Sequence, residues 1–231
     1  MVSRSSTKHS IPSFGSASKR SLKCRVRVTH KKAEAVAAFQ EQAAERLRGV
    51  VPPDTTRSIK VFAQDESRFG LHTIRRRRLT ARGVQPVGIS QHDFQNFYLY
   101  GAVGPTTGND FFLELPHLDS TNFQVFLDAF AAAYPDTLNL VMLDNSRCHT
   151  AKAVRVPDNV RFVFLPPYSP ELNPIERLWR DLKDKLAWLH FSTLAEQQDF
   201  VGALLRAYTP AVIQSLTSYR YFVDAVNALT L

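Results

Sequence analysis

The chain has 231 residues, of which 44% are hydrophobic and 22% are charged, and its formal net charge is +8. These values lie near the averages of soluble globular proteins, so they exclude collagen-like, coiled-coil and wholly disordered chains. No apolar run reaches the roughly 18 residues of a membrane-spanning helix, and the two cysteines, Cys24 and Cys148, cannot build a disulfide framework. A cytoplasmic location is expected.

Residues 1–30 have a composition of their own. They contain eight serines and seven basic residues but no acid, so almost all of the net charge lies there. No helical or strand period is sustained, which is typical of a disordered basic leader. A transit peptide or a nucleic-acid-binding arm would have the same composition, and the sequence does not separate these alternatives.

Residues 31–50 are predicted to form a linker helix. The segment is rich in strong helix formers, and its apolar residues recur at spacings of three and four: Val36, Phe39, Ala43 and Leu47. The pair Pro52-Pro53 ends the helix because proline cannot continue the backbone hydrogen bonding. A domain is predicted to begin near residue 57.

The predicted domain, residues 57–220, contains both strands and helices. Strands are expected at 58–64, 96–103, 111–115, 138–143 and 160–165, with a hairpin turn at 104–109. Helices are expected at 121–134, from Asn173-Pro174 to about Leu189, at 194–207 and at 210–217. This order indicates an α/β fold around a mixed sheet, and residues 221–231 are predicted to be a C-terminal tail.

Three acids lie where predicted elements end or begin. Asp65 follows the first strand, Asp144 follows the strand at 138–143, and Glu176 lies in the first turn of the long helix. In an α/β sheet, such positions meet at one edge. Clustered carboxylates repel one another unless a cation neutralises them, and oxygen ligands favour Mg²⁺ or Mn²⁺. Two such ions about 3.5–4 Å apart support phosphodiester transfer.

Each acid also has an ordinary structural explanation. Asp65 and Asp144 stand in turn-forming sequences, where an aspartate often bonds the following backbone. With Asn173 as the N-cap, Glu176 would fall at the third helical position of a capping box. The joint pattern of two strand ends and one helix start favours a metal site over three unrelated turns or caps.

Longer motifs surround these acids. They are Gln64-Asp65-Glu66-Ser67-Arg68-Phe69-Gly70, Leu143-Asp144-Asn145 with His149, and the run from Leu165 to Trp179, LPPYSPELNPIERLW. Together they resemble the catalytic domain of bacterial insertion-sequence transposases of the mariner-like superfamily, which carry an Asp-Asp-Glu triad. The resemblance extends from about residue 31 to about residue 220.

The resemblance implies a ribonuclease H-like fold, a mixed five-stranded sheet flanked by helices. It also implies that Asp65, Asp144 and Glu176 are catalytic residues that ligate Mg²⁺ or Mn²⁺, with two ions in the site. The implied activity is cleavage of DNA at transposon ends and transfer of the freed 3′-hydroxyl to target DNA, in a bacterial, nucleoid-associated protein. Assembly as a homodimer or larger complex on DNA is implied as well.

Other polar residues near the triad have less definite roles. Glu66 adjoins Asp65 but should point to the other side of the strand. His149 and Asn145 are expected to be at most indirect contributors, and His149 is predicted to be partly exposed. The basic run Arg75–Arg78 is predicted to form a strand or hairpin, either solvated or in contact with DNA phosphates.

Related transposases carry an N-terminal helix-turn-helix region that reads transposon ends, and residues 1–30 lack the two amphipathic helices of such a region. A truncated copy is therefore expected. The alternative function is a non-catalytic DNA-binding remnant that interferes with an intact transposase. A weaker alternative assigns two of the carboxylates to glycoside hydrolysis.

Overall fold

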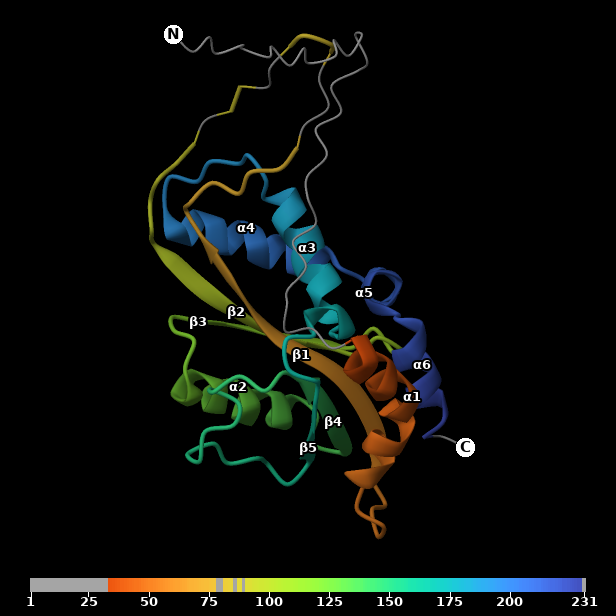
Figure 1. Ribbon diagram of the computed structural model, residues 1–231. Coiled ribbons are helices and arrows are strands. Elements are labelled where there is room, and N and C mark those ends of the chain that lie inside the picture. The colour runs from red at the N-terminus through yellow and green to blue at the C-terminus, as the bar shows by residue number, and fades with distance from the viewer. Residues whose placement is uncertain (1–32, 78–80, 85–86, 89, 230–231) are drawn as a thin grey trace, which may run out of the picture. The chain divides into compact units, whose positions relative to one another are not determined.

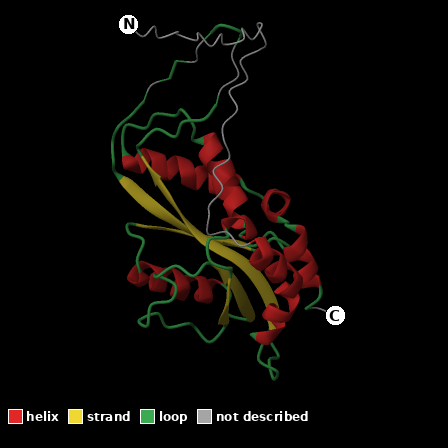
Figure 2. Ribbon diagram, in the orientation of Figure 1, coloured by secondary structure: helices red, strands yellow, loops and turns green. Residues whose placement is uncertain are grey.

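The structure is a computed structural model that describes residues 33–77, 81–84, 87–88 and 90–229. The predicted leader, residues 1–30, lies outside the described residues. All described residues belong to one compact unit. Its centre is a five-stranded sheet with helices on both faces (Figures 1 and 2).

The sheet is mixed, as the sequence predicts, and its strand order is β3-β2-β1-β4-β5. The strands are β1 (Ser58–Gly70), β2 (Asn96–Val103), β3 (Asp110–Leu115), β4 (Thr137–Leu143) and β5 (Val160–Phe164). β1 pairs antiparallel with β2 and parallel with β4. β4 pairs parallel with β5, and β2 and β3 form the predicted hairpin.

Helices cover the two faces of the sheet unequally. α2 (Ser120–Ala133) packs against one face, where its phenylalanines join an aromatic cluster. The other face is covered by α1 (Ala33–Gly49), α3 (Ile175–Lys185), α4 (Leu194–Ala207), α5 (Pro210–Thr217) and α6 (Arg220–Asn227). Among the described helices, none has the length and apolar character needed to cross a bilayer.

The central strands are buried on both faces because helices lie above and below them. Leu140 and Met142 of β4 join the larger core cluster, whereas Val141 and Leu143 join the cluster under α2. This alternation follows the period of two that a strand imposes on its side chains. The continuous apolar run of β4 is therefore the sequence signal of a central parallel strand.

β1 is longer than the predicted strand at 58–64. Its parallel pairing with β4 ends at Ala63, but its antiparallel pairing with β2 continues to Gly70. The expectation that Asp65 follows the strand is therefore wrong, since Asp65 lies inside it. What changes beyond Ala63 is the loss of one neighbouring strand, so β1 projects beyond the parallel half of the sheet.

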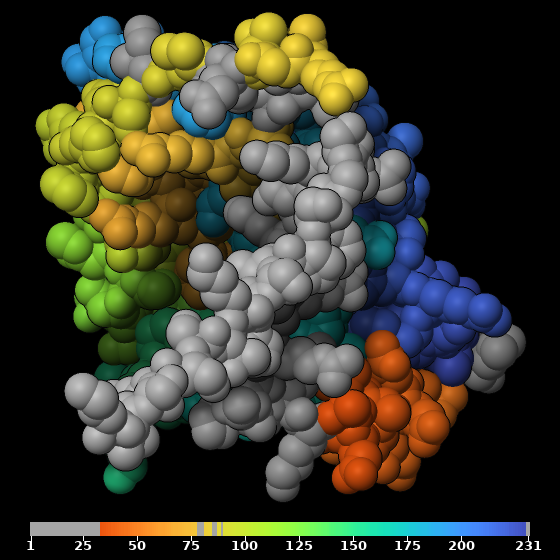
Figure 3. Space-filling view, turned by 45° about the horizontal axis from the view of Figure 1, so that its top comes forward, coloured from red at the N-terminus to blue at the C-terminus, as the bar shows by residue number. Residues whose placement is uncertain are grey.

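Two further segments differ from the expectation. Within the predicted tail at 221–231, residues up to Asn227 belong to α6, and this helix lies beside α1 (Figures 1 and 3). Phe222 of α6 is fully buried. The long helix predicted to reach Leu189 ends at Lys185, and Trp188 beyond it adopts a left-handed backbone with φ of 65°.

Candidate active site

Asp65, Asp144 and Glu176 line one cavity of about 540 Å³. They come from β1, from the loop after β4 and from the first turn of α3. The proline-rich segment that joins β5 to α3 forms much of the remaining wall, with Pro166, Pro167, Tyr168, Ser169 and Pro170. The structure therefore brings together the three acids that the sequence singles out.

The fold explains why these distant residues meet. β1 and β4 are adjacent and parallel, so Asp65 and Asp144 lie at the same edge of the parallel half of the sheet. Glu176 is brought to this edge by the loop after β5. Asn173, just before α3, donates a hydrogen bond of 2.8 Å from Nδ2 to the carbonyl oxygen of Gln64, which ties the start of the helix to β1.

The indole of Trp179 forms a hydrogen bond with Asp65. The indole Nε1 donates to Oδ2 of Asp65 over 3.1 Å, and the ring is 2% exposed. Gly101 of β2, which pairs with Asp65, leaves room for this ring. A Cβ atom at residue 101 would lie 2.7 Å from Trp179 and 2.9 Å from the ring of Phe112.

Replacing Gly101 by Ala is therefore expected to destabilise the protein by about 1–3 kcal/mol, the usual cost of overpacking a core. The displaced indole would also weaken the support of Asp65. Chemical denaturation of the wild type, Gly101→Ala and Gly49→Ala measures the effect. Gly49 has open space around its Cβ position, so its substitution should be nearly neutral, and equal stability of all three proteins would contradict the packing account.

Asp144 is the most open of the three acids, with 56% of its side chain exposed. Its Oδ1 accepts a hydrogen bond of 2.9 Å from the backbone N–H of Ser146 and lies 2.8 Å from Nδ1 of His149. The hydrogen bond from His149 is the main reason that the pKa of Asp144 is lowered. Asp144 is therefore ionised and held in one orientation.

Glu176 occupies the second helical position of α3, after Pro174 as N-cap, instead of the predicted third position after Asn173. No side-chain hydrogen bond caps this helix start, so the capping-box explanation of Glu176 is wrong. Burial raises the pKa of Glu176, and the charges of Lys183 and Arg180 oppose this rise. The carboxylate thus stays close to two cations on its own helix.

The site has the chemistry of a divalent-cation site. Burial raises the pKa of Asp65 well above its ordinary value, and the negative charges of Glu66, Glu176 and Asp144 add to this rise. A cation would relieve that repulsion. Asn173 also lines the cavity, and its buried Oδ1 has no hydrogen-bond partner among the described residues. An all-oxygen donor set of this kind fits Mg²⁺ or Mn²⁺.

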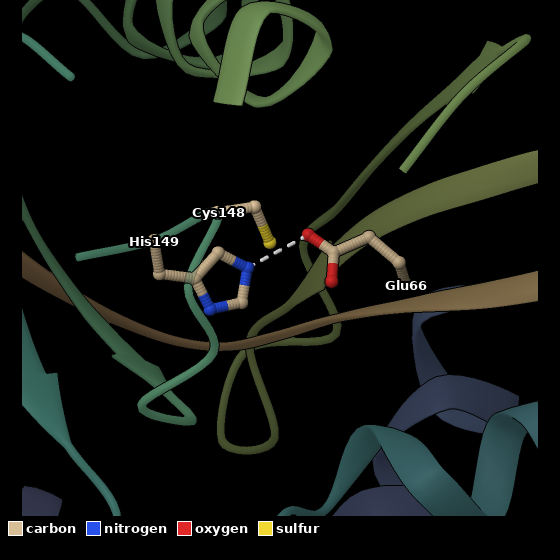
Figure 4. Close-up of side chains that lie close together, drawn as sticks. All are labelled: Glu66, Cys148 and His149. Atoms are coloured by element: carbon tan, nitrogen blue, oxygen red, sulfur yellow. Dashed lines mark hydrogen bonds and ion pairs between the residues drawn. The ribbon is translucent and has the colours of Figure 1, made fainter. Parts of the chain in front are cut away.

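Glu66 points away from Asp65, as its position on the strand predicts, and contacts His149 on the α2 side of the sheet (Figure 4). His149 is 3% exposed, so the expectation of a partly exposed residue is wrong. Asn145 instead donates from Nδ2 to the carbonyl oxygen of Leu165 over 2.6 Å. That bond joins the ends of two strands and is structural.

Trp179 and Lys183 were not anticipated as parts of the site. Burial lowers the pKa of Lys183, while the negative charges of Glu176 and Asp65 raise it, so its ammonium group is close to both acids. The sequence nevertheless contains a signal for both residues, namely their spacing from Glu176. Residues three and seven positions after Glu176 lie on the same face of an α-helix, and both Trp179 and Lys183 occupy such positions.

The basic run is predicted to form a strand or hairpin, and its described part forms no strand, since residues 71–77 are irregular. Backbone hydrogen bonds still link Leu71 to Gln95 and Thr73 to Gln91, which prolong the β1–β2 pairing. Arg75, Arg76 and Arg77 are exposed, and Arg76 forms an ion pair with Asp184 of α3. Arg78 lies outside the described residues.

Comparison with known proteins identifies the family to which the chain belongs. Residues 60–198 match the DDE superfamily endonucleases. The chain is 35% identical over 118 residues to the uncharacterized protein y4pE/y4sA of Sinorhizobium fredii (strain NBRC 101917 / NGR234). The matched region covers 51% of this chain and 86% of that protein.

Solved structures with a similar fold include the catalytic domain of Mos1 mariner transposase, with 14% identity, a TM-score of 0.54, and coverage of 88% of this chain and 97% of that chain. The Mos1 transposase paired-end complex with left transposon end gives 16% identity, a TM-score of 0.61 and coverage of 92% of this chain. This chain spans 66% of the length of that transposase. The predicted ribonuclease H-like fold is thus confirmed, and the chain belongs to the DDE superfamily endonucleases.

Proposed function

We propose that this protein cleaves DNA phosphodiester bonds at transposon ends and transfers the resulting 3′-hydroxyl to target DNA, with Mg²⁺ or Mn²⁺ as cofactor. The observation that carries the proposal is that Asp65, Asp144 and Glu176 line one cavity, although they come from three separate segments. Membership of the DDE superfamily endonucleases supports the same chemistry.

Asp65, Asp144 and Glu176 would hold two divalent cations. When bound, such ions activate the attacking oxygen and stabilise the leaving oxygen of the phosphodiester. Asp65 accepts a hydrogen bond from Trp179, and Asp144 is held by Ser146 and His149. Glu176 lies in the first turn of α3. Because Asp65 and Asp144 accept these hydrogen bonds, both carboxylates can be oriented before the cations and DNA arrive.

The residues around the acids suit a phosphate backbone. Lys183 and Arg180 of α3 bring positive charge to Glu176, and an ammonium or guanidinium group there would attract the scissile phosphate. The prolines at 166, 167, 170 and 174 restrict the loop that forms the cavity wall. The exposed residues Arg75–Arg77 would contact DNA phosphates without reading sequence.

Two copies of the chain are expected to act together, each on one transposon end. The Mos1 structures include a paired-end complex and a strand-transfer complex, and an insertion needs two ends in one assembly. Within the chain, residues 57–220 are proposed as the catalytic domain, and α1 as the helix that leads into it. A bacterial, nucleoid-associated location is proposed together with this activity.

A two-part nuclease assay tests the proposal. The protein is incubated with supercoiled plasmid, and separately with plasmid plus a labelled duplex that ends in a 3′-hydroxyl, in Mg²⁺, Mn²⁺, Ca²⁺ or EDTA. Nicking is expected in Mg²⁺ and Mn²⁺ but not in EDTA. Joining of the label to plasmid is expected under the same ionic conditions.

The alternative of a non-catalytic DNA-binding remnant gives a different result. Such a protein would shift the duplex in a gel but would neither nick nor join it in any cation. DNA binding without cation-dependent nicking would therefore reject the proposed activity. Nicking without joining would retain the endonuclease and reject the strand-transfer part.

A further inference from the structure

Behind the cavity, on the α2 side of the sheet, three side chains with acidic, thiol and imidazole groups lie close together. They are Glu66 of β1 and Cys148 and His149 of the loop after β4, and their potential ligand atoms lie within 4.8 Å of one another (Figure 4). The side chains of His149 and Glu66 are 1% and 5% exposed. A charged cluster this deeply buried requires an explanation.

Hydrogen bonds provide that explanation without an ion. Nε2 of His149 lies 2.9 Å from Oε1 of Glu66, and its Nδ1 lies 2.8 Å from Oδ1 and 3.1 Å from the carbonyl oxygen of Asp144. Both ring nitrogens therefore face acceptors. The ring is therefore held at both nitrogens, by Asp144 on one side and by Glu66 on the other.

The imidazole ring lies between two carboxylates, and neighbouring side chains fix its position. Phe123 of α2 packs on it, with the ring centroids 4.4 Å apart. Glu66 is itself anchored by Gln64, whose Nε2 donates to Oε1 over 2.8 Å. The backbone carbonyl of the same Gln64 accepts the hydrogen bond from Asn173, so one stretch of β1 anchors both His149 and the start of α3.

This chain of contacts matters most for Asp144, the most exposed acid of the three. Its Oδ1 is engaged by Ser146 and His149, whereas Oδ2 has no hydrogen bond to any residue that the structure describes. Because hydrogen bonds fix Oδ1, the carboxylate cannot rotate freely, and Oδ2 remains available to bind a cation. Residues behind a metal ligand commonly act in this way.

We propose that His149 and Glu66 are positioning residues: His149, fixed by its contact with Glu66, holds Asp144 in the orientation in which it binds the catalytic cation. The inference rests on the proposed function. It assigns roles to two residues that do not line the cavity with the triad.

Two substitutions of His149 separate its two hydrogen bonds. In His149→Asn, the amide nitrogen replaces Nδ1 and can still donate to Asp144. In His149→Gln, the longer side chain puts the amide nitrogen near Nε2, so it contacts Glu66 instead. Both remove the imidazole ring, so a purely structural role for His149 predicts similar losses in the two variants.

Mn²⁺ titration by calorimetry of the full chain at one pH is the test, with thermal unfolding recorded for every variant. His149→Gln is expected to weaken Mn²⁺ binding by about 10–100-fold, the usual cost of losing a residue behind a metal ligand. His149→Asn and Glu66→Gln, which keep the bond to Asp144 or the acceptor for Nε2, should stay closer to the wild type.

A matched control is Asn139→Ala. Asn139 is fully buried and hydrogen-bonded at the opposite end of β4, so its loss should lower the melting temperature without changing Mn²⁺ affinity. Equal weakening in His149→Gln and His149→Asn, or weakening in Asn139→Ala that follows its loss of stability, would overturn the positioning role. Cys148→Ser should bind Mn²⁺ as the wild type does.

Two other outcomes are distinguishable from these. Loss of Mn²⁺ binding in Cys148→Ser would mean that Glu66, Cys148 and His149 themselves hold the ion, which overturns the inference. A wild-type protein that binds no Mn²⁺ would contradict the proposed function as well. Unchanged affinity in His149→Gln, with normal binding by the wild type, would contradict the inference alone.

Discussion

Replacing Asp144 by Asn is expected to lower the rate of Mg²⁺-dependent DNA nicking by at least about 10³-fold. Cation stabilisation of the transferring phosphate contributes several kcal/mol, and each 1.4 kcal/mol or so corresponds to a factor of ten in rate. Asparagine keeps the size of the side chain and an oxygen that can accept from Ser146 and His149. The loss would therefore reflect the missing negative charge.

Asp136→Asn is the matched control for this experiment. Asp136 is an exposed acid immediately before β4, whose other end leads into Asp144. Its substitution removes the same charge at the other end of β4, far from the cavity, so nicking should remain at the wild-type rate. A nicking rate for Asp144→Asn equal to that of Asp136→Asn would exclude Asp144 from the catalytic site.

Replacing Asp65 by Asn should have opposite effects on stability and on cation binding. The pKa of Asp65 is raised above its ordinary value of 3.8, because of its burial and then the nearby negative charges. The folded chain therefore binds this proton more tightly than the unfolded chain does. Ionisation of Asp65 must then cost stability as the pH rises through and above 3.8.

At neutral pH without cations, Asp65→Asn is accordingly expected to be more stable than the wild type by on the order of 1–3 kcal/mol. That gain corresponds to about 2–4 °C in melting temperature per kcal/mol for a chain of this size. The difference should disappear as the pH falls below 3.8, where the wild-type carboxyl is protonated in both states. Asparagine can still accept from Trp179, so that contact is preserved.

Cations should reverse the order of the two proteins. Mn²⁺ at 100 times its dissociation constant should stabilise the wild type by about 2.7 kcal/mol, but it should have little effect on Asp65→Asn. Melting curves across pH, with and without Mn²⁺, measure both effects. A variant that is less stable than the wild type at neutral pH without cations would contradict the view that Asp65 carries a charge penalty.

The sequence predicts the bounds of several strands and helices well. β2, α4 and α5 begin and end at the predicted residues, and the β2–β3 turn lies at the predicted position. β4 differs by one residue because its apolar run coincides with full burial on both faces. In these elements, local pattern and tertiary environment favour the same structure.

The ends of β1 and α3 could not be predicted, because tertiary contacts determine where these two elements end. Residues after Gln64 look like a turn because Asp and Ser are frequent there, yet the antiparallel pairing with β2 keeps them extended to Gly70. Trp188 looks like one more helical position, but its backbone N–H donates to the carbonyl oxygen of Ile74 outside the helix. Neither partner can be identified from the local sequence.

In the candidate site as well, some residues could be predicted from the sequence and others could not. The three acids could be selected from the sequence because longer motifs surround them, and a strand end and a helix start also mark Asp144 and Glu176. The contact between Glu66 and His149 could not, because each looks like an ordinary polar residue near a turn or strand. Only the packing of α2 over the end of β4 explains why His149 is buried.

The most direct measurement of the central claim is anomalous X-ray diffraction from crystals of the full chain soaked in MnCl₂. The claim predicts manganese peaks within ligand distance of carboxylate oxygens of Asp65, Asp144 and Glu176, and their loss in crystals of Asp144→Asn. Manganese absent from this cavity, or bound only by Glu66, Cys148 and His149, would contradict it.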